Sequence, residues 1–275
     1  MSARGSVARS RDTACVDVMP TTALAPAGPN NRKPWDSLPL WQEIRTFTEL
    51  GTLTSHPVWT DPPLDAAGLP VVLVGGLSVG PRMLNPLRTW LERANCRPII
   101  APTRYGVGCG EATAQCVQTT IRRYADRVGE PVVVIGYSRG GQFSRASTVR
   151  DPEPVRALIT LASPLRSIFA VHPILKAKAS ALGMAGTLGV PGLMRFSCLW
   201  GACCRSLRQD LRAPFPAEVP FVSIYSEQDT MVDWRSCLDT EARHRHISAS
   251  HLGMIASPQA FLAIAEELSA FVPSR

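Results

Sequence analysis

Pro131-Val-Val-Val-Ile-Gly-Tyr-Ser-Arg-Gly-Gly141 is the most informative segment of this 275-residue chain. Residues 132–135 are four consecutive β-branched residues, which is typical of a strand buried on both faces of a parallel sheet. The pattern G-x-S-x-G then surrounds Ser138, and in this pattern a strand turns sharply into a helix and presents the serine hydroxyl. A Cβ at Gly136 or Gly140 would collide with the neighbouring strand or helix. We therefore predict that Ser138 is a nucleophile. The alternative is an ordinary strand-to-helix turn.

The rest of the chain alternates apolar strands with helical segments. Further strands are predicted at residues 70–74, 96–101, 155–161, 220–225 and 243–247. Helices are predicted at residues 38–50, 83–95, 111–128, 142–150 and 258–271. This order predicts a mostly parallel sheet, covered by helices on both faces and joined by right-handed crossovers. The first of these helices is expected to dock its apolar face on the core.

The loop after the strand at residues 70–74 reads Gly75-Gly-Leu-Ser-Val-Gly80. In folds with a strand-serine-helix turn, the loop after this strand supplies one main-chain N–H that stabilises an oxyanion. The residue after the serine supplies the other. We therefore predict an oxyanion hole formed by the main-chain N–H groups of Leu77 and Arg139. The alternative is a plain turn that uses glycines for tightness.

A serine hydroxyl is a weak nucleophile unless a base takes its proton and a carboxylate orients that base. Both are expected downstream of Ser138, in the order acid and then histidine. Asp229 follows the strand at residues 220–225 by a few positions, so we predict it as the acid. Glu227 is a further candidate. Asp233 begins the next helical segment and is predicted to be its N-cap.

Of the five histidines, His251 alone lies in a loop of glycine and serine between the last strand and the last helix. We predict that it is the general base. His244 and His246 alternate with arginines within the strand, which indicates an exposed face. His56 and His172 are predicted to have surface or packing roles, because catalysis needs partners within reach.

Residues 165–219 interrupt the alternation of strands and helices. This segment is much longer than an ordinary crossover, so we predict an insertion. Its central part is apolar and contains Gly183, Gly186, Gly189 and Gly192, which favours a helical lid over an acyl pocket. The alternative uses for its basic residues are contact with an anionic membrane surface or with a phosphate-bearing carrier such as coenzyme A or phosphopantetheine.

The net charge of +7 is concentrated in two places, residues 1–35 and residues 165–219. There is no basic stripe interleaved with aromatic residues, which argues against a nucleic-acid partner. Residues 1–35 show no periodicity and are predicted to be a mobile tail, while residues 36–275 form one domain. Residues 1–30 contain no apolar run long enough for a signal peptide, so a cytoplasmic location is expected.

The eight cysteines are expected to be free thiols of a reducing compartment. The alternative is a local disulfide clip among Cys198, Cys203, Cys204 and Cys237. The spacing of these residues lacks a second pair of ligands, which argues against a zinc site. The glycine-rich run Tyr105-Gly-Val-Gly-Cys-Gly110 does not match a dinucleotide-binding fingerprint. We therefore predict neither a metal nor an organic cofactor.

With these residues in place, the chain resembles the α/β-hydrolase superfamily and, within it, bacterial lipases and esterases. The resemblance spans roughly residues 68–272 and rests on the segments Gly136-Tyr-Ser-Arg-Gly140, Leu161-Ala-Ser-Pro164, Ser223-Ile-Tyr-Ser-Glu-Gln-Asp229 and Ser250-His-Leu-Gly-Met254. More narrowly, Cys203-Cys204 before Ala213-Pro-Phe-Pro216 is similar to uncharacterised actinobacterial hydrolases. The resemblance implies an α/β-hydrolase fold with a helical lid insertion.

We expect a serine hydrolase that cleaves the carboxylic ester or thioester of a hydrophobic acyl substrate, a small molecule, through Ser138, His251 and Asp229. One alternative is an acyltransferase or cyclising thioesterase that acts on a carrier-bound metabolite in a water-excluding pocket. Another is a ligand-binding protein that retains a hydrolase fold without activity.

Overall fold

The computed structural model describes residues 43–165, 167 and 169–272. The predicted tail at residues 1–35 lies outside the described residues, and so does the first part of the helix predicted at residues 38–50. No helix among the described residues is long and apolar enough to cross a membrane.

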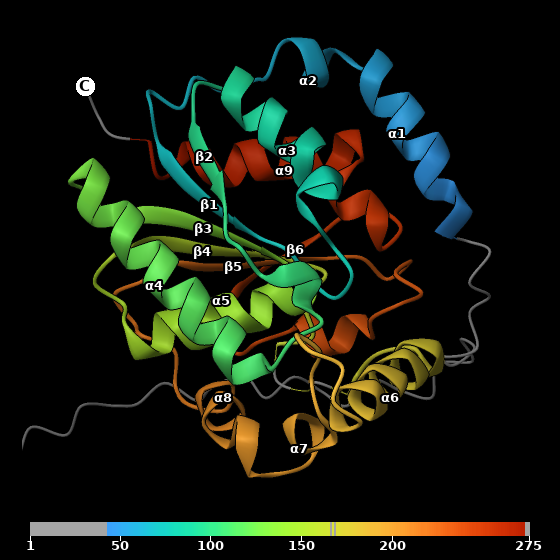
Figure 1. Ribbon diagram of the computed structural model, residues 1–275. Helices are drawn as coiled ribbons and strands as arrows, with labels where there is room; N and C mark the ends of the chain where they lie inside the picture. The colour runs from blue at the N-terminus through green and yellow to red at the C-terminus, as the bar shows by residue number, and fades with distance from the viewer. Residues whose placement is uncertain (1–42, 166, 168, 273–275) are drawn as a thin grey trace, which may run out of the picture. The chain divides into compact units, whose positions relative to one another are not determined.

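Six parallel strands form one sheet in the order β2-β1-β3-β4-β5-β6 (Figure 1). They are β1 (Pro70–Val74), β2 (Arg97–Ile100), β3 (Val132–Tyr137), β4 (Val155–Leu161), β5 (Phe221–Tyr225) and β6 (Arg243–His246). All six predicted strands are confirmed to within two residues at either end. Because the strands are parallel, their carboxyl ends share one edge of the sheet, where ligand sites form in open α/β folds.

Helices cover both faces of this sheet, as predicted (Figure 1). The α-helices are α1 (Arg45–Ser55), α2 (Pro57–Thr60), α3 (Pro81–Arg93), α4 (Gly110–Val128), α5 (Arg139–Arg150), α6 (Pro173–Thr187), α7 (Phe196–Leu199), α8 (Arg205–Asp210) and α9 (Pro258–Ser269). The short 3₁₀ turns are η3 (Arg104–Gly106), η4 (Ala202–Cys204), η5 (Trp234–Cys237) and η6 (Leu252–Ile255). Helices α3 and α9 lie on one face, and α4 and α5 lie on the other.

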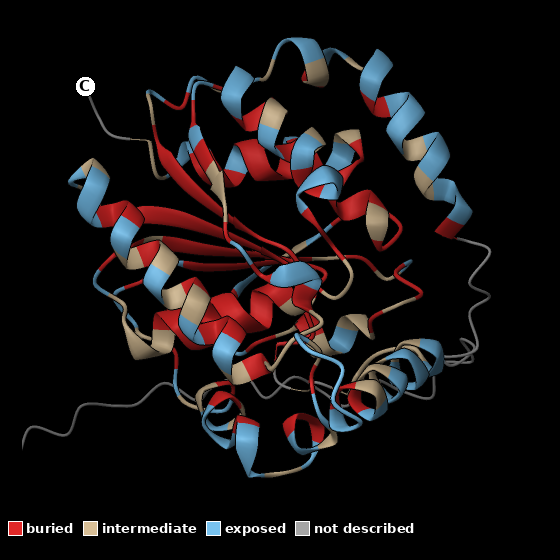
Figure 2. Cartoon of the chain, viewed as in Figure 1, coloured by how far each residue is buried: buried red, intermediate tan, exposed pale blue. Residues whose placement is uncertain are grey.

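The strands separate two hydrophobic clusters. In β1, Val71 and Leu73 belong to one cluster and Val72 and Val74 to the other, as the two-residue period of a strand requires. The uninterrupted apolar runs in the sequence therefore arise because both faces of these strands are buried. Figure 2 shows the consequence, since the central strands and α5 are buried while α1 and α6 are largely exposed.

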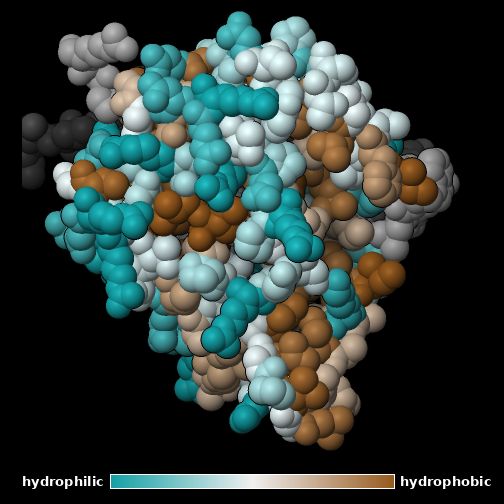
Figure 3. Space-filling model, turned by 45° about the horizontal axis from the view of Figure 1, so that its top comes forward, coloured by the Kyte–Doolittle hydropathy of each residue, from teal (hydrophilic) through white to brown (hydrophobic). Residues whose placement is uncertain are grey.

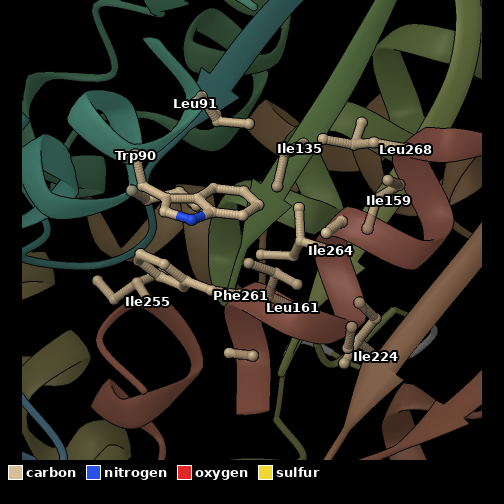
Figure 4. Packing of buried hydrophobic residues seen from close by; sticks show 14 of the residues in the cluster. Trp90, Leu91, Ile135, Ile159, Leu161, Ile224, Ile255, Phe261, Ile264 and Leu268 are labelled. Atoms are coloured by element: carbon tan, nitrogen blue, oxygen red, sulfur yellow. The ribbon is translucent and has the colours of Figure 1, made fainter. Parts of the chain in front are cut away.

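Aromatic packing fixes α3 against α9. The ring centroids of Trp90 and Phe261 lie 5.0 Å apart, and Trp90 Nε1 donates a hydrogen bond to the carbonyl oxygen of Val58 at 2.7 Å. Figure 4 shows both rings beside Ile135 of β3 and Ile264 of α9. The indole thus satisfies its only donor while its ring fills the core.

The structure corrects the prediction for α1. The helix was expected to bury an apolar face, but Ile44 and Phe47 are 62% and 78% exposed, and Leu53 is the residue of α1 that is buried. The polar face turns inward instead, because Glu49 accepts a hydrogen bond from the main-chain N–H of Ser250 at 2.9 Å. Leu40 and Trp41, which belonged to the predicted apolar face, lie outside the described residues.

The segment at residues 165–219 contains α6, α7, η4 and α8, which lie together beyond α5 (Figure 1). Large apolar side chains are exposed on the surface of this segment. Figure 3, which colours one face of the molecule by hydropathy, shows patches of hydrophobic surface between hydrophilic ones. The exposed large apolar residues of this segment are Ile174, Met184, Leu188, Val190 and Trp200.

A buried arginine joins this insertion to the sheet. Arg145 of α5 has no exposed side-chain surface, and its Nε donates to Asp239 Oδ2 at 2.8 Å. Its Nη1 and Nη2 donate to the carbonyl oxygens of Asp210 and Ala213, at the end of the insertion. A buried guanidinium needs both a counter-charge and hydrogen-bond acceptors, so its position fixes these three segments together.

Candidate active site

Ser138 occupies the sharp turn between β3 and α5, as the sequence predicts. Its backbone has φ 55° and ψ −126°, a strained conformation for a residue other than glycine. Two hydrogen bonds hold the turn, because Ser138 N donates to Leu161 O at 2.8 Å and Gly141 N donates to Ser138 O at 3.0 Å. Such strain persists only where the surrounding structure enforces it, as it does between these two elements.

The glycines that flank Ser138 have the steric role predicted for them. A Cβ at Gly136 would lie 2.6 Å from Gly141 Cα in α5, and a Cβ at Gly140 would overlap the main-chain oxygen of Val74 in β1. Cβ atoms in folded proteins essentially never come this close to another heavy atom. The turn therefore forms only because the helix can approach the sheet without side chains between them.

The structure brings Ser138, His251 and Asp229 together. His251 Nε2 lies 3.1 Å from Ser138 Oγ, and His251 Nδ1 lies 2.7 Å from Asp229 Oδ2. All three residues are at most 9% exposed. A carboxylate only accepts hydrogen bonds, so in the neutral ring Nδ1 carries the proton and Nε2 accepts from the serine hydroxyl. This tautomer is the one that a general base beside a serine requires.

Main-chain groups fix the Asp229 carboxylate. Its Oδ1 accepts hydrogen bonds from the N–H groups of Met231 and Val232, both at 2.8 Å. Oδ2 is thereby directed at the imidazole, and Asp229, rather than Glu227 or Asp233, is the carboxylate at His251 Nδ1.

The other acidic and histidine side chains singled out in the sequence have local structural roles. Asp233 is the N-cap of η5, as predicted, and accepts from Arg235 N at 3.1 Å. His56 and His172 cap α2 and α6 through Nδ1. His244 and His246 are exposed in β6, as predicted.

Leu77 and Arg139 both line the cavity into which Ser138 opens. Arg139 is the first residue of α5, so its main-chain N–H has no partner within the helix. The loop after β1 packs directly on the turn, since a Cβ at Gly76 would lie 2.8 Å from Ser138 Cβ and 3.1 Å from Arg139 N. The two residues predicted to form the oxyanion hole therefore lie on adjacent backbone segments and line the same cavity as Ser138.

Sequence reasoning missed Glu43, which is 9% exposed. Its Oε1 accepts from Thr230 Oγ1 at 2.6 Å and from His251 N at 3.3 Å, and its Oε2 accepts from Leu252 N at 3.4 Å. One carboxylate thus connects the loop that carries Asp229 to the loop that carries His251. No local pattern marks this role, because the partners lie 187 and 208 residues away in the sequence.

The electrostatic surroundings favour the protonated form of His251. Burial alone lowers the pKa of the imidazole, since it disfavours the charged ring. The charge and hydrogen bond of Asp229 and the charge of Glu43 act in the opposite direction, and they raise the pKa of His251 above its ordinary value. The pair of carboxylates therefore stabilises the imidazolium that proton transfer from a serine would create.

A cavity of about 230 Å³ opens at Ser138. Its wall is mostly apolar, and the insertion supplies much of it through Phe169, Val171, Leu175, Ala179, Leu199, Trp200 and Leu207. The rings of Phe169 and Trp200 stack with their centroids 4.2 Å apart. Three cationic residues, Arg139, Lys176 and Arg208, lie in the same lining. The hydrogen-bonded residues Ser138, His251 and Asp229 therefore lie at a largely apolar cavity.

No protein-family model and no curated protein matches this sequence. Among solved structures, the mature lipase BlEst2 of Bacillus licheniformis is 17% identical with a TM-score of 0.55, over 76% of this chain and 96% of that one. A monoacylglycerol lipase of Paleococcus ferrophilus is 15% identical with a TM-score of 0.52, and the match covers 74% of this chain and 96% of that one. The α/β-hydrolase enzyme MGS-MChE2, from a sediment metagenome of the Mar Chica lagoon in Morocco, is 18% identical with a TM-score of 0.51, over 74% and 91%. These likenesses establish an α/β-hydrolase fold, which confirms the predicted fold class.

The role of Glu43 can be measured without any substrate. Replacing it in Glu43→Gln keeps the shape of the side chain but removes a negative charge near the imidazole. The pKa of His251, followed by NMR of ¹³C-labelled histidine, is expected to fall by up to about 1 unit. Glu49→Gln is the matched control, because Glu49 also binds the loop of His251, but through Ser250 rather than through the main chain of His251. An unchanged pKa of His251 in Glu43→Gln would show that Glu43 has no electrostatic effect on the ring.

Proposed function

We propose that this protein with an α/β-hydrolase fold is a serine hydrolase, and that it cleaves the ester or thioester of a hydrophobic acyl group. The observation that carries the proposal is the connected series Ser138, His251 and Asp229, with contacts of 3.1 and 2.7 Å, at the mouth of a mostly apolar cavity. A serine with both a base and an orienting carboxylate in reach is equipped for acyl transfer through a covalent intermediate.

In the proposed reaction, His251 Nε2 takes the proton of Ser138 Oγ while Oγ bonds to the acyl carbonyl carbon. The imidazolium, held by Asp229, then gives this proton to the departing alcohol or thiol as its bond to the carbonyl carbon breaks. Water next enters, loses a proton to His251 and attacks the acyl-enzyme. Transfer of that proton to Ser138 Oγ releases the carboxylic acid and restores the site.

The main-chain N–H groups of Leu77 and Arg139 are proposed to stabilise the negative oxygen of each tetrahedral intermediate. Their adjacency to the hydroxyl supports this assignment, since such donors act where charge develops during the reaction. One donor of this kind contributes about 3 to 4 kcal/mol to the transition state.

The insertion at residues 165–219 is proposed to act as a lid over the acyl group. The apolar residues that it contributes to the cavity support this role, because a hydrocarbon chain gains about 0.8 kcal/mol for each methylene group that it buries. A closed cavity also excludes water from the carbonyl until the leaving group departs.

A second candidate substrate is an acyl group carried on a phosphate-bearing thiol. Lys176 and Arg208 both line the cavity, and Arg208 Nη1 is buried without a hydrogen-bond partner in the described part of the chain. A buried donor of this kind favours an anionic acceptor. This arrangement supports a thioesterase or an acyltransferase with the same nucleophile.

The first test is covalent labelling. A fluorophosphonate probe is expected to modify Ser138 in the folded protein, as located by peptide mapping, because the activated hydroxyl attacks phosphorus. Ser138→Ala should abolish labelling and reduce hydrolysis of p-nitrophenyl esters by about 10⁴-fold or more. Ser180→Ala, which changes another serine of the cavity lining, should retain both.

Failure of the folded protein to react with the probe would contradict the assignment of Ser138 as the nucleophile. Stabilisation by esters without turnover would instead favour a non-catalytic binding protein. Product that contains an added alcohol or amine nucleophile would favour acyl transfer over hydrolysis.

The second test concerns the acyl pocket. Ala179 lines the cavity from α6, so Ala179→Trp is expected to lower kcat/KM for p-nitrophenyl octanoate by about 10-fold or more while leaving the acetate ester nearly unaffected. Ala177→Trp is the control, because Ala177 is an exposed residue of the same helix. If the wild-type protein hydrolysed only the acetate ester, the proposed role of the insertion as a lid over the acyl group would be contradicted.

The third test compares octanoyl-coenzyme A with p-nitrophenyl octanoate, which carry the same acyl group. If a phosphate reaches Arg208, Arg208→Gln should lower kcat/KM for the thioester by about 10-fold or more and spare the neutral ester. Arg205→Gln removes an exposed charge nearby and should change neither. Equal losses on both substrates would argue against phosphate recognition.

A further inference from the structure

Four cysteines form a compact cluster beside the cavity. The Sγ atoms of Cys109, Cys198, Cys203 and Cys204 all lie within 4.8 Å of one another. Cys109 directly precedes α4, while the other three come from α7 and η4 in the insertion. All four are free thiols.

The cluster corrects the sequence-based reasoning about cysteines. The alternative to free thiols was a local clip that included Cys237, but that thiol is buried in η5 and does not belong to the cluster. Cys109 takes its place, 94 residues before Cys203 in the sequence. Cys109, from a distant loop, is therefore the fourth sulfur that the spacing Cys198-x4-Cys203-Cys204 lacks.

The spacing of the sulfur atoms matches a tetrahedral metal site. Cys109 Sγ lies 3.4 Å from Cys203 Sγ and 3.8 Å from Cys204 Sγ, and Cys198 Sγ lies 3.6 Å from Cys203 Sγ. Zn²⁺ bonds to thiolate sulfur at about 2.3 Å, so the corners of a regular ZnS₄ tetrahedron are about 3.8 Å apart. In a multi-iron cluster, the four thiolates are divided between two or four irons, which requires wider spacing.

A buried positive charge stands beside the four sulfurs. The Arg139 guanidinium interacts electrostatically with Cys109, Cys198 and Cys204, and its Nη1 is fixed by a hydrogen bond to Gly106 O at 2.8 Å. Gly110 lies beside both groups, since a Cβ there would lie 3.3 Å from Arg139 Nη2 and 3.6 Å from Cys204 Sγ. Zn²⁺ with four thiolates carries two net negative charges, which this cation would partly compensate.

Main-chain N–H groups also face the sulfur atoms. Arg195 N donates to Cys198 Sγ at 3.4 Å. The first turn of α4, a helix of 19 residues, directs the N–H groups of Glu111 and Ala112 at the sulfurs of Cys204 and Cys109. Donors of this kind stabilise thiolates in the shell around a metal. The cluster thus has both the ligand geometry and the surroundings of a metal centre.

We propose that Cys109, Cys198, Cys203 and Cys204 bind one Zn²⁺. The four thiols lose their protons as four Zn–S bonds form. Because protein ligands fill all four positions, no place remains for a reactive water, and the site is structural rather than catalytic.

The zinc connects the insertion to the sheet domain. Cys198 and Cys204 also line the cavity that contains Ser138, so the metal fixes one wall of the proposed acyl pocket. The metal site itself does not depend on the proposed hydrolase activity, and it is testable without a substrate.

The test begins with the full chain purified under reducing conditions without chelators. Inductively coupled plasma mass spectrometry is expected to find about one zinc per chain. Cys203→Ser should reduce this to below about 0.1, and the exposed position of Cys203 means that its replacement does not disturb the core. Cys116→Ser is the matched control, since Cys116 lies on α4 outside the cluster, and it should retain the metal.

Cobalt supplies a second readout, on metal-free reduced protein whose fold is checked by circular dichroism. Added Co²⁺ is expected to give strong tetrahedral d–d absorption and thiolate-to-metal charge-transfer bands, which Zn²⁺ displaces and Cys203→Ser abolishes. If the reduced protein takes up neither Zn²⁺ nor Co²⁺, the proposal is overturned.

Thiol counting separates the metal site from a disulfide. In denaturant with chelator and no reductant, the zinc protein should yield all eight thiols of the sequence. One disulfide would leave six thiols and two would leave four, and either result without bound zinc would replace the metal site with a covalent clip. Iron with cluster absorption in place of zinc would also contradict the proposal.

Discussion

The positive φ of Ser138 is the constraint on which the arrangement of the site depends. A strand that must reverse into a helix within one residue can do so only where the helix touches the sheet, which is why Gly136, Gly140 and Gly76 have no room for a Cβ. The same contact places the loop after β1 beside the start of α5. The steric requirement of one turn therefore sets the hydroxyl, its neighbouring N–H groups and the floor of the cavity together.

A second level of organisation is polar and comes from α1 and from Glu43 just before it. Glu43 and Glu49 accept hydrogen bonds from the loops of Asp229 and His251, so residues far away in the sequence link the loops that follow the neighbouring strands β5 and β6. Burying these carboxylates requires hydrogen-bond donors, and the main chain of the loops supplies them. This requirement explains why α1 turns its polar face to the protein and leaves Phe47 exposed.

The sequence alone predicted most of the sheet, because strands buried on both faces appear as continuous apolar runs, and β3 is the clearest case. It also led to the correct partners of Ser138, since the order of the elements limits which carboxylate and which histidine can reach the same sheet edge. Glu43 and Cys109 could not be found in this way. Their partners lie far along the chain, and no motif in the neighbouring residues indicates these long-range contacts.

The insertion at residues 165–219 is held at its start by the bridge between Val171 and Val232 and by the hydrogen bond from His172 N to Met231 O. Its second half is anchored to α5 through Arg145 and to α4 through the thiol cluster. The first half, α6, is followed by Gly189 and Gly192, both with positive φ and with free space around them. Backbone rotation there meets little steric resistance. Since α6 also carries Leu175 and Ala179 into the cavity, displacement of α6 would widen the proposed acyl pocket while the anchored half keeps the wall beside Ser138 in place.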